Sequence, residues 1–126
     1  MINYSENKEL FILVIVIVLN MLNVGILWNT KYLCFAIAMA LFFILLCQDY
    51  SKYGVNKKYL VISALICFFG GPIIENIMIV MSNDNCWIYG NPIKPLKVSL
   101  DLFPGYGIMA ITNILIYNFY VSSKII

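Results

Sequence analysis

The sequence predicts an all-α fold, a polytopic membrane protein built as a bundle of four transmembrane helices. Of the 126 residues, 63% are hydrophobic and only 11% are charged, against about 45–50% and about 25% in soluble domains. One membrane-spanning helix needs about 20 apolar residues, so the apolar content is enough for about four spans. The runs are apolar on every face, whereas a membrane-spanning β-strand alternates apolar and polar residues.

The first expected span covers residues 10–28, an apolar run that only Asn20 and Asn23 interrupt. The run is too long for a signal peptide and no small-residue cleavage site follows it, so we interpret it as an uncleaved signal anchor. Residues 29–31 are the whole connection to the second expected span, residues 32–48. The first two spans should therefore form a tight antiparallel hairpin.

The second half of the sequence predicts two further spans. A polar decapeptide, residues 49–58, precedes the third expected span, residues 59–81. Residues 82–100 contain two prolines and no apolar periodicity, so we expect a loop along the membrane interface. The fourth expected span covers residues 102–121. Because no linker, repeat or change of composition divides the chain, residues 1–126 are expected to form a single integral membrane domain.

Lysines near the span ends predict the orientation of the bundle. Four spans place both termini on the same side as the second connection. That side collects five lysines, namely Lys8, Lys52, Lys57, Lys58 and Lys124. The opposite side collects three, namely Lys31, Lys94 and Lys97. Because cytoplasmic loops carry the excess of basic residues, we expect both termini in the cytoplasm.

Several function classes are excluded by composition. The chain has no histidine, its basic residues are all lysine and its net charge is +2, so it offers no basic face for nucleic acid. Cys34, Cys47 and Cys67 lie in apolar runs, and Cys86 has no histidine nearby, so we expect neither disulfides nor a zinc site. Soluble-enzyme and cofactor motifs are absent. Lysine without arginine, together with abundant asparagine and tyrosine, indicates an AT-rich genome.

Glu75 is the one carboxylic acid deep inside an expected span. It precedes Met81 by six residues, which is about 9 Å along a helix. An acid inside the membrane indicates a functional site, and the alternative is a carboxyl that holds neighbouring helices together by a hydrogen bond. No lysine lies at that depth, so we expect a neutral acid rather than a buried ion pair. A single glutamate also offers too few ligands for a metal.

The residues around Glu75 predict a pocket. Pro72 shares a helix face with Glu75 and should kink the helix, because proline removes one backbone hydrogen bond. Asn23 and Tyr106 lie near the depth of Glu75 when residues are counted inward from the outer span ends, and Asn76 lies beside it. We therefore expect these four residues to contribute to substrate binding, with Glu75 as the catalytic residue.

Two motifs in residues 71–107 carry a family resemblance. A Gly-Pro-x-x-Glu motif ends at Glu75, and a Trp-x-Tyr motif runs from Trp87 to Tyr89. The pattern resembles small, largely uncharacterised multi-pass membrane proteins that share both motifs. More distantly, it is similar to carotenoid-biosynthesis and lycopene-cyclase-type membrane proteins. The resemblance implies that Glu75, Trp87 and Tyr89 are site positions, and the alternative for both aromatic residues is anchoring at the lipid head groups.

Three functions are therefore open from the sequence. The first is a pocket around Glu75 that binds or transforms an apolar, isoprenoid-like molecule, with Glu75 as general acid. The second is a structural or assembly protein of the membrane without a catalytic site. The third is a proton-linked transporter or channel formed by a homo-oligomer. The expected partners are the lipid bilayer and an apolar ligand, without a metal, another cofactor or nucleic acid.

Overall fold

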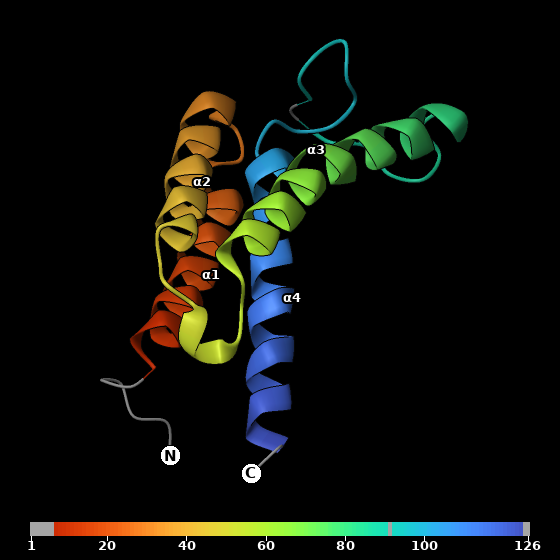
Figure 1. Ribbon diagram of the computed structural model, residues 1–126. Coiled ribbons are helices and arrows are strands. Elements are labelled where there is room, and N and C mark those ends of the chain that lie inside the picture. The colour runs from red at the N-terminus through yellow and green to blue at the C-terminus, as the bar shows by residue number, and fades with distance from the viewer. Residues whose placement is uncertain (1–6, 91, 125–126) are drawn as a thin grey trace.

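A computed structural model describes residues 7–90 and 92–124 as an all-helical bundle (Figure 1). The helices are α1 (Lys8–Leu27), α2 (Lys31–Leu46), the short 3-10 helix η1 (Ser51–Tyr53), α3 (Lys57–Met81) and α4 (Leu102–Lys124). The described residues form no β-strand beyond one isolated bridge between Pro92 and Ser99. The all-α class and the four-helix bundle predicted from composition are confirmed.

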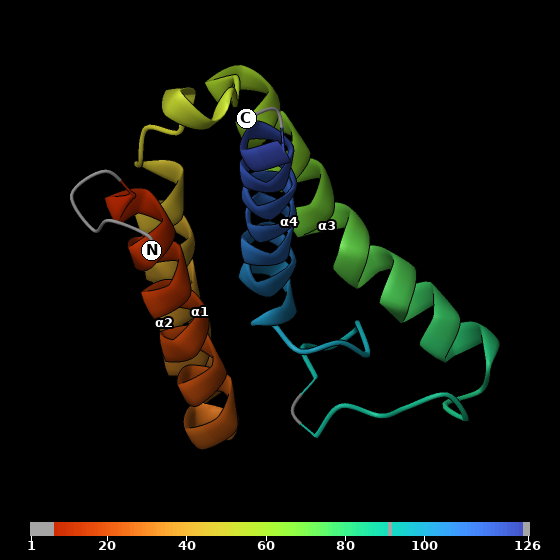
Figure 2. The ribbon, with the colours of Figure 1, turned by 90° about the horizontal axis from the view of Figure 1, so that it is seen from below.

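Helix α4 is the centre of the bundle. It contacts α1, α2 and α3, while α1 and α2 pair with each other as the predicted hairpin. Figure 2 shows α4 between the α1–α2 pair and α3, which leans away from the other helices. The start of α1 and the end of α4 lie at one end of the bundle (Figure 1). The connections after α1 and after α3 lie at the other end, which we call the loop end.

Apolar side chains on the outside of the helices show that the chain is a membrane protein. Three helices of the described chain are long and apolar enough to cross a membrane, namely α1, α3 and residues 102–121 of α4. Helix α2 is as apolar but has only 16 residues. On α3, Ile66 and Ile74 are 66% and 60% exposed. Soluble monomers rarely expose contiguous apolar surface on this scale, whereas lipid covers it at no cost.

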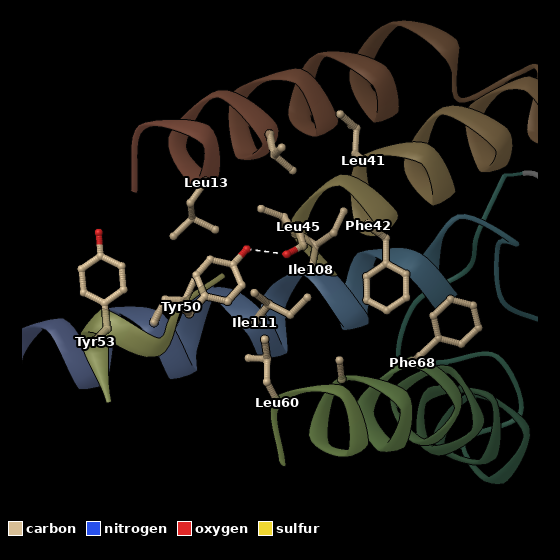
Figure 3. Close-up of a cluster of buried hydrophobic side chains, with 13 residues drawn as sticks. Leu13, Leu41, Phe42, Leu45, Tyr50, Tyr53, Leu60, Phe68, Ile108 and Ile111 are labelled. Atoms are coloured by element: carbon tan, nitrogen blue, oxygen red, sulfur yellow. Dashed lines mark hydrogen bonds between the residues drawn. The ribbon is translucent and has the colours of Figure 1, made fainter. Parts of the chain in front are cut away.

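The core lies where all four helices meet, with Leu13 and Val16 of α1 among its buried residues (Figure 3). Phe42 of α2 and Phe68 of α3 stack with ring centroids 5.5 Å apart. Gly107 lets the Phe42 ring pack directly against the backbone of α4, because a Cβ at Gly107 would lie 2.5 Å from that ring. The Tyr50 hydroxyl donates to the Leu45 carbonyl within the same cluster, so its polar atom is satisfied at a buried position.

At the end opposite the loop end, η1 and its flanking residues are fastened to α1. The Lys52 ammonium lies 2.8 Å from the carboxylate of Glu9, which is buried at the start of α1. The hydroxyl of Tyr53 donates to the Asn7 side chain at 3.3 Å. Lys57 donates to the carbonyl of Gln48 at 2.7 Å. The polar decapeptide predicted from the sequence is thus an ordered connection with its own helical turn.

Candidate functional site

Two tyrosines from two other elements lie near Glu75 at the loop end. The Tyr89 hydroxyl, in the connection between α3 and α4, donates to Glu75 Oε1 at 2.5 Å. Tyr106 of α4 lines the same cavity as Glu75. Burial and the neighbouring Glu75 carboxylate hold the pKa of the Tyr89 phenol above its usual range, so Tyr89 keeps its proton and donates it. Glu75 is therefore fixed by a hydrogen bond from the connection between α3 and α4.

Gly71 explains how Tyr106 reaches Glu75. A Cβ on Gly71 would lie 2.4 Å from the Tyr106 ring, so the ring lies directly against the α3 backbone one turn before Glu75. Residues four apart lie one above the other on a helix, and the Tyr106 side chain therefore lies near both Gly71 and Glu75. Pro72 is fully buried next to this contact, and α3 continues as a helix through it. Gly71 and Glu75 of the Gly-Pro-x-x-Glu motif therefore lie near the same tyrosine, Tyr106.

Glu75 lines a cavity of about 320 Å³ that we call the acidic cavity. Helix α4 contributes half of the lining residues, and α1 and α3 contribute the others together with Asp101. Its lining residues are Asn20 and Val24 of α1, Glu75 of α3, Asp101, and Leu102, Gly105, Tyr106 and Met109 of α4. The acid predicted from the sequence thus faces a space shared by three helices.

A second cavity, of about 230 Å³, continues from the acidic cavity between α1 and α4. The two cavities share Asn20, Gly105 and Met109. The remaining lining residues of the second cavity are Ile17, Met21, Ile108 and Thr112. We call the two cavities together the α1–α4 groove. It has two carboxyl groups at its loop end and a mainly apolar lining along its length.

Asn20 and Asp101 are functional candidates that the predicted site did not include. Burial raises the pKa of the Asp101 carboxyl, which lies just before α4. Asn20 Oδ1 is buried and has no hydrogen-bond partner among the described residues. One available signal was helical spacing, because Asp101, Gly105 and Met109 recur every four residues and therefore share one face of the chain entering α4.

The other predicted site residues are not part of the lining of the acidic cavity. Asn23 donates to the Cys34 carbonyl of α2 at 2.9 Å and so joins the hairpin. Asn76 accepts from the Lys97 backbone N–H at 2.7 Å and so fastens the connection to α3. Trp87 is 36% exposed in the same connection as Tyr89. Pro72 is buried outside the acidic cavity. The structure therefore brings Glu75, Tyr89 and Tyr106 together, while Asn23 and Asn76 hydrogen-bond to backbone groups of other segments.

Neither a metal centre nor a disulfide is found in the described part of the chain. No group of three or more metal-ligating side chains is found among these residues. All four cysteines are free, and Cys34 is buried while Cys47 and Cys86 are exposed. Comparison with protein families, curated proteins and solved structures finds no match to the chain. The function must therefore be argued from the site itself.

Proposed function

We propose that the chain binds an apolar, isoprenoid-like molecule in the α1–α4 groove, with Glu75 as the polar contact at the loop end. One observation carries the proposal: a carboxyl group that accepts a hydrogen bond from a phenol lines one end of a groove whose remaining lining is mainly apolar. Ligand sites typically combine a mostly apolar wall with a few convergent polar groups. The groove extends along α1 and α4, which suits an extended chain better than a compact ligand.

The same geometry supports acid chemistry on a bound alkene. In its neutral form the Glu75 carboxyl transfers its proton to an alkene carbon and leaves a carbocation and a carboxylate. The Tyr89 hydroxyl already donates to that carboxyl, and Tyr106 lines the same cavity. Donors placed in advance stabilise the developing negative charge in a site of low dielectric. Glu75 is therefore the general acid of the proposed reaction, and Tyr89 is its positioning residue.

Gly105→Leu tests the groove directly. Gly105 lines both cavities, and a Cβ there meets nothing within 4 Å, so a larger side chain at this position begins in open space and occupies part of the groove. We expect at least tenfold weaker binding of geranylgeraniol by the purified full chain, with unchanged helix content and melting temperature. Gly25→Leu is the matched control, because Gly25 is equally open on α1 but lines neither cavity.

Glu75→Gln separates the proposed function from its alternatives. The amide preserves the shape of the site, so we expect geranylgeraniol to stay bound while proton transfer to it is lost. A structural or assembly role predicts that neither Glu75→Gln nor Gly105→Leu changes ligand binding. A proton-linked transporter predicts proton flux in vesicles that Glu75→Gln abolishes and Gly105→Leu leaves intact. Either of these results would contradict the proposal.

A further inference from the structure

A further cavity lies between the end of α3 and the connection that follows it, and we call it the loop cavity. Its volume is about 700 Å³, against about 320 Å³ for the acidic cavity. Its apolar walls come from the buried Ile79 of α3 and from Ile88 and Leu96 of the connection. Ligand sites range from about 300 to about 1,000 Å³. The loop cavity is therefore of ligand size, and it shares no lining residue with the α1–α4 groove.

Several contacts hold the walls of the loop cavity in place. The Ile93 backbone N–H donates to the Val98 carbonyl at 3.0 Å and closes a turn of the connection. Asn76 fastens this turn to α3 by accepting from the Lys97 backbone N–H. Tyr89, which also lines the cavity, is tied to α3 by its hydrogen bond at 2.5 Å. The chain itself therefore fixes the shape of the cavity, which lowers the ordering cost of binding.

The side chains that line the loop cavity carry an excess of positive charge. Lys94 and Lys97 line it together with a single acid, Asp84. That acid is already paired, because both of its carboxylate oxygens accept from Lys97 Nζ, at 2.7 and 2.9 Å. Lys94 has no ion pair or hydrogen bond within the part of the chain that the structure describes. The Lys94 ammonium is therefore the charge left for a ligand, and it favours an anion.

The loop cavity also lies at the depth of the lipid head groups. It is placed between the end of α3 and the start of α4, two helices long and apolar enough to cross a membrane. Beside it, Met81 and Ile88 are 79% and 76% exposed, which suits side chains that contact lipid. Lysines at a membrane surface attract anionic lipids. The nearest supply of anions with apolar chains is therefore the bilayer itself.

We infer that the loop cavity binds one anionic phospholipid, with its phosphate on Lys94 and part of an acyl chain against Ile79, Ile88 and Leu96. A zwitterionic phospholipid brings its own cation, which repels Lys94 and weakens the attraction to the phosphate. Free phosphate has the required charge but leaves the apolar walls uncovered. The inference is independent of the ligand proposed for the α1–α4 groove, because the two sites share no lining residue.

Native mass spectrometry of the purified full chain counts bound lipid directly. The probes are phosphatidylglycerol and phosphatidylcholine with the same acyl chains, and inorganic phosphate as competitor. We expect one phosphatidylglycerol per chain, bound more tightly than phosphatidylcholine and not displaced by phosphate. Lys94→Gln should weaken phosphatidylglycerol about tenfold, the low end of what a hydrogen bond to a charged group contributes, and leave phosphatidylcholine unchanged. Lys31→Gln is the matched control, because Lys31 begins α2 at the same end of the bundle but does not line the loop cavity.

Three results would overturn the inference. Equal binding of the two lipids means that the cavity does not select an anion. Equal weakening by Lys94→Gln and Lys31→Gln means that general attraction at the membrane surface, rather than the cavity, holds the lipid. Displacement of the lipid by inorganic phosphate means a site for a free anion. None of these results bears on binding in the α1–α4 groove, which Gly105→Leu tests separately.

Discussion

Gly70 and Gly71 are adjacent in α3, but only Gly71 is packed against another side chain. A Cβ on Gly70 meets nothing within 4 Å, whereas a Cβ on Gly71 meets three atoms of the Tyr106 ring, the farthest at 2.6 Å. These atoms include the first ring carbon, so a simple rotation of the ring does not relieve the clash. The position of Tyr106 therefore depends on Gly71.

We expect Gly71→Ala to lower the free energy of unfolding by about 1–3 kcal/mol, the usual cost of overpacking a close contact. Gly70→Ala is the control and should raise the same quantity by up to about 1 kcal/mol, because alanine favours the helix. Chemical unfolding in detergent micelles measures both. Equal effects of the two substitutions would mean that the Tyr106 ring does not lie against Gly71.

Tyr89 gives a test that depends on pH. A free phenol titrates near pH 10, and burial together with Glu75 raises the pKa of Tyr89 above that value. Because the folded pKa is raised, the bond to Glu75 contributes its full stability below about pH 10 and loses it as the pH rises through the folded pKa. Tyr89→Phe should therefore remove one late-titrating phenol from a spectrophotometric titration of the folded protein. If Tyr89→Phe instead removes a phenol that titrates near pH 10, the hydrogen bond between Tyr89 and Glu75 is contradicted.

Single residues also show how far the site could be predicted. The depth of Glu75 in its span indicated Tyr106, and the Trp-x-Tyr motif indicated Tyr89. Counting depth does not indicate which neighbour a side chain faces, because each residue turns the helix by about 100°. Asn23 therefore turned out to bind α2, while Asn20, three residues earlier, lines the groove. Asp101 was left out of the predicted site because it lies at the expected boundary of the last span.

At the scale of elements, apolar run length predicted the helices well. All four helices begin and end within three residues of the expected spans. The connection of residues 82–100 was predictable only as a loop, because its fold depends on contacts with α3. Asn76 binds the Lys97 backbone, Glu75 binds Tyr89, and Asp84 pairs with Lys97 at 2.7 Å. Local sequence does not reveal such distant partners.

Asn76→Ala should loosen this connection, because the Lys97 backbone N–H loses its acceptor. We expect faster hydrogen–deuterium exchange over residues 93–98, with little change within α3. Asn118→Ala is the control, since Asn118 donates only within its own helix, to the Ile114 carbonyl at 2.8 Å. Unchanged exchange in the Asn76 variant would show that other contacts hold the connection in place.

At the scale of the whole molecule, two natural cysteines report the topology. Cys47 follows α2, and Cys86 lies in the connection at the loop end; both are exposed. In sealed vesicles of uniform orientation, a membrane-impermeant maleimide should label one thiol before permeabilisation and the other only afterwards. Cys47→Ser and Cys86→Ser assign each signal to its residue. Labelling of both cysteines from the same side would rule out the arrangement of four spans.

The helices differ in length, and the membrane must accommodate the difference. At 1.5 Å per residue, the 16 residues of α2 extend about 24 Å, against about 30 Å of hydrocarbon in a typical bilayer. The 25 residues of α3 extend about 37 Å and fit only when inclined, as Figure 2 shows. A short span draws the two lipid leaflets together and a long one tilts, and both responses relieve hydrophobic mismatch. With four spans, we therefore expect a thinner bilayer beside α2 than beside α3, so that lipids around one molecule meet two different membrane thicknesses.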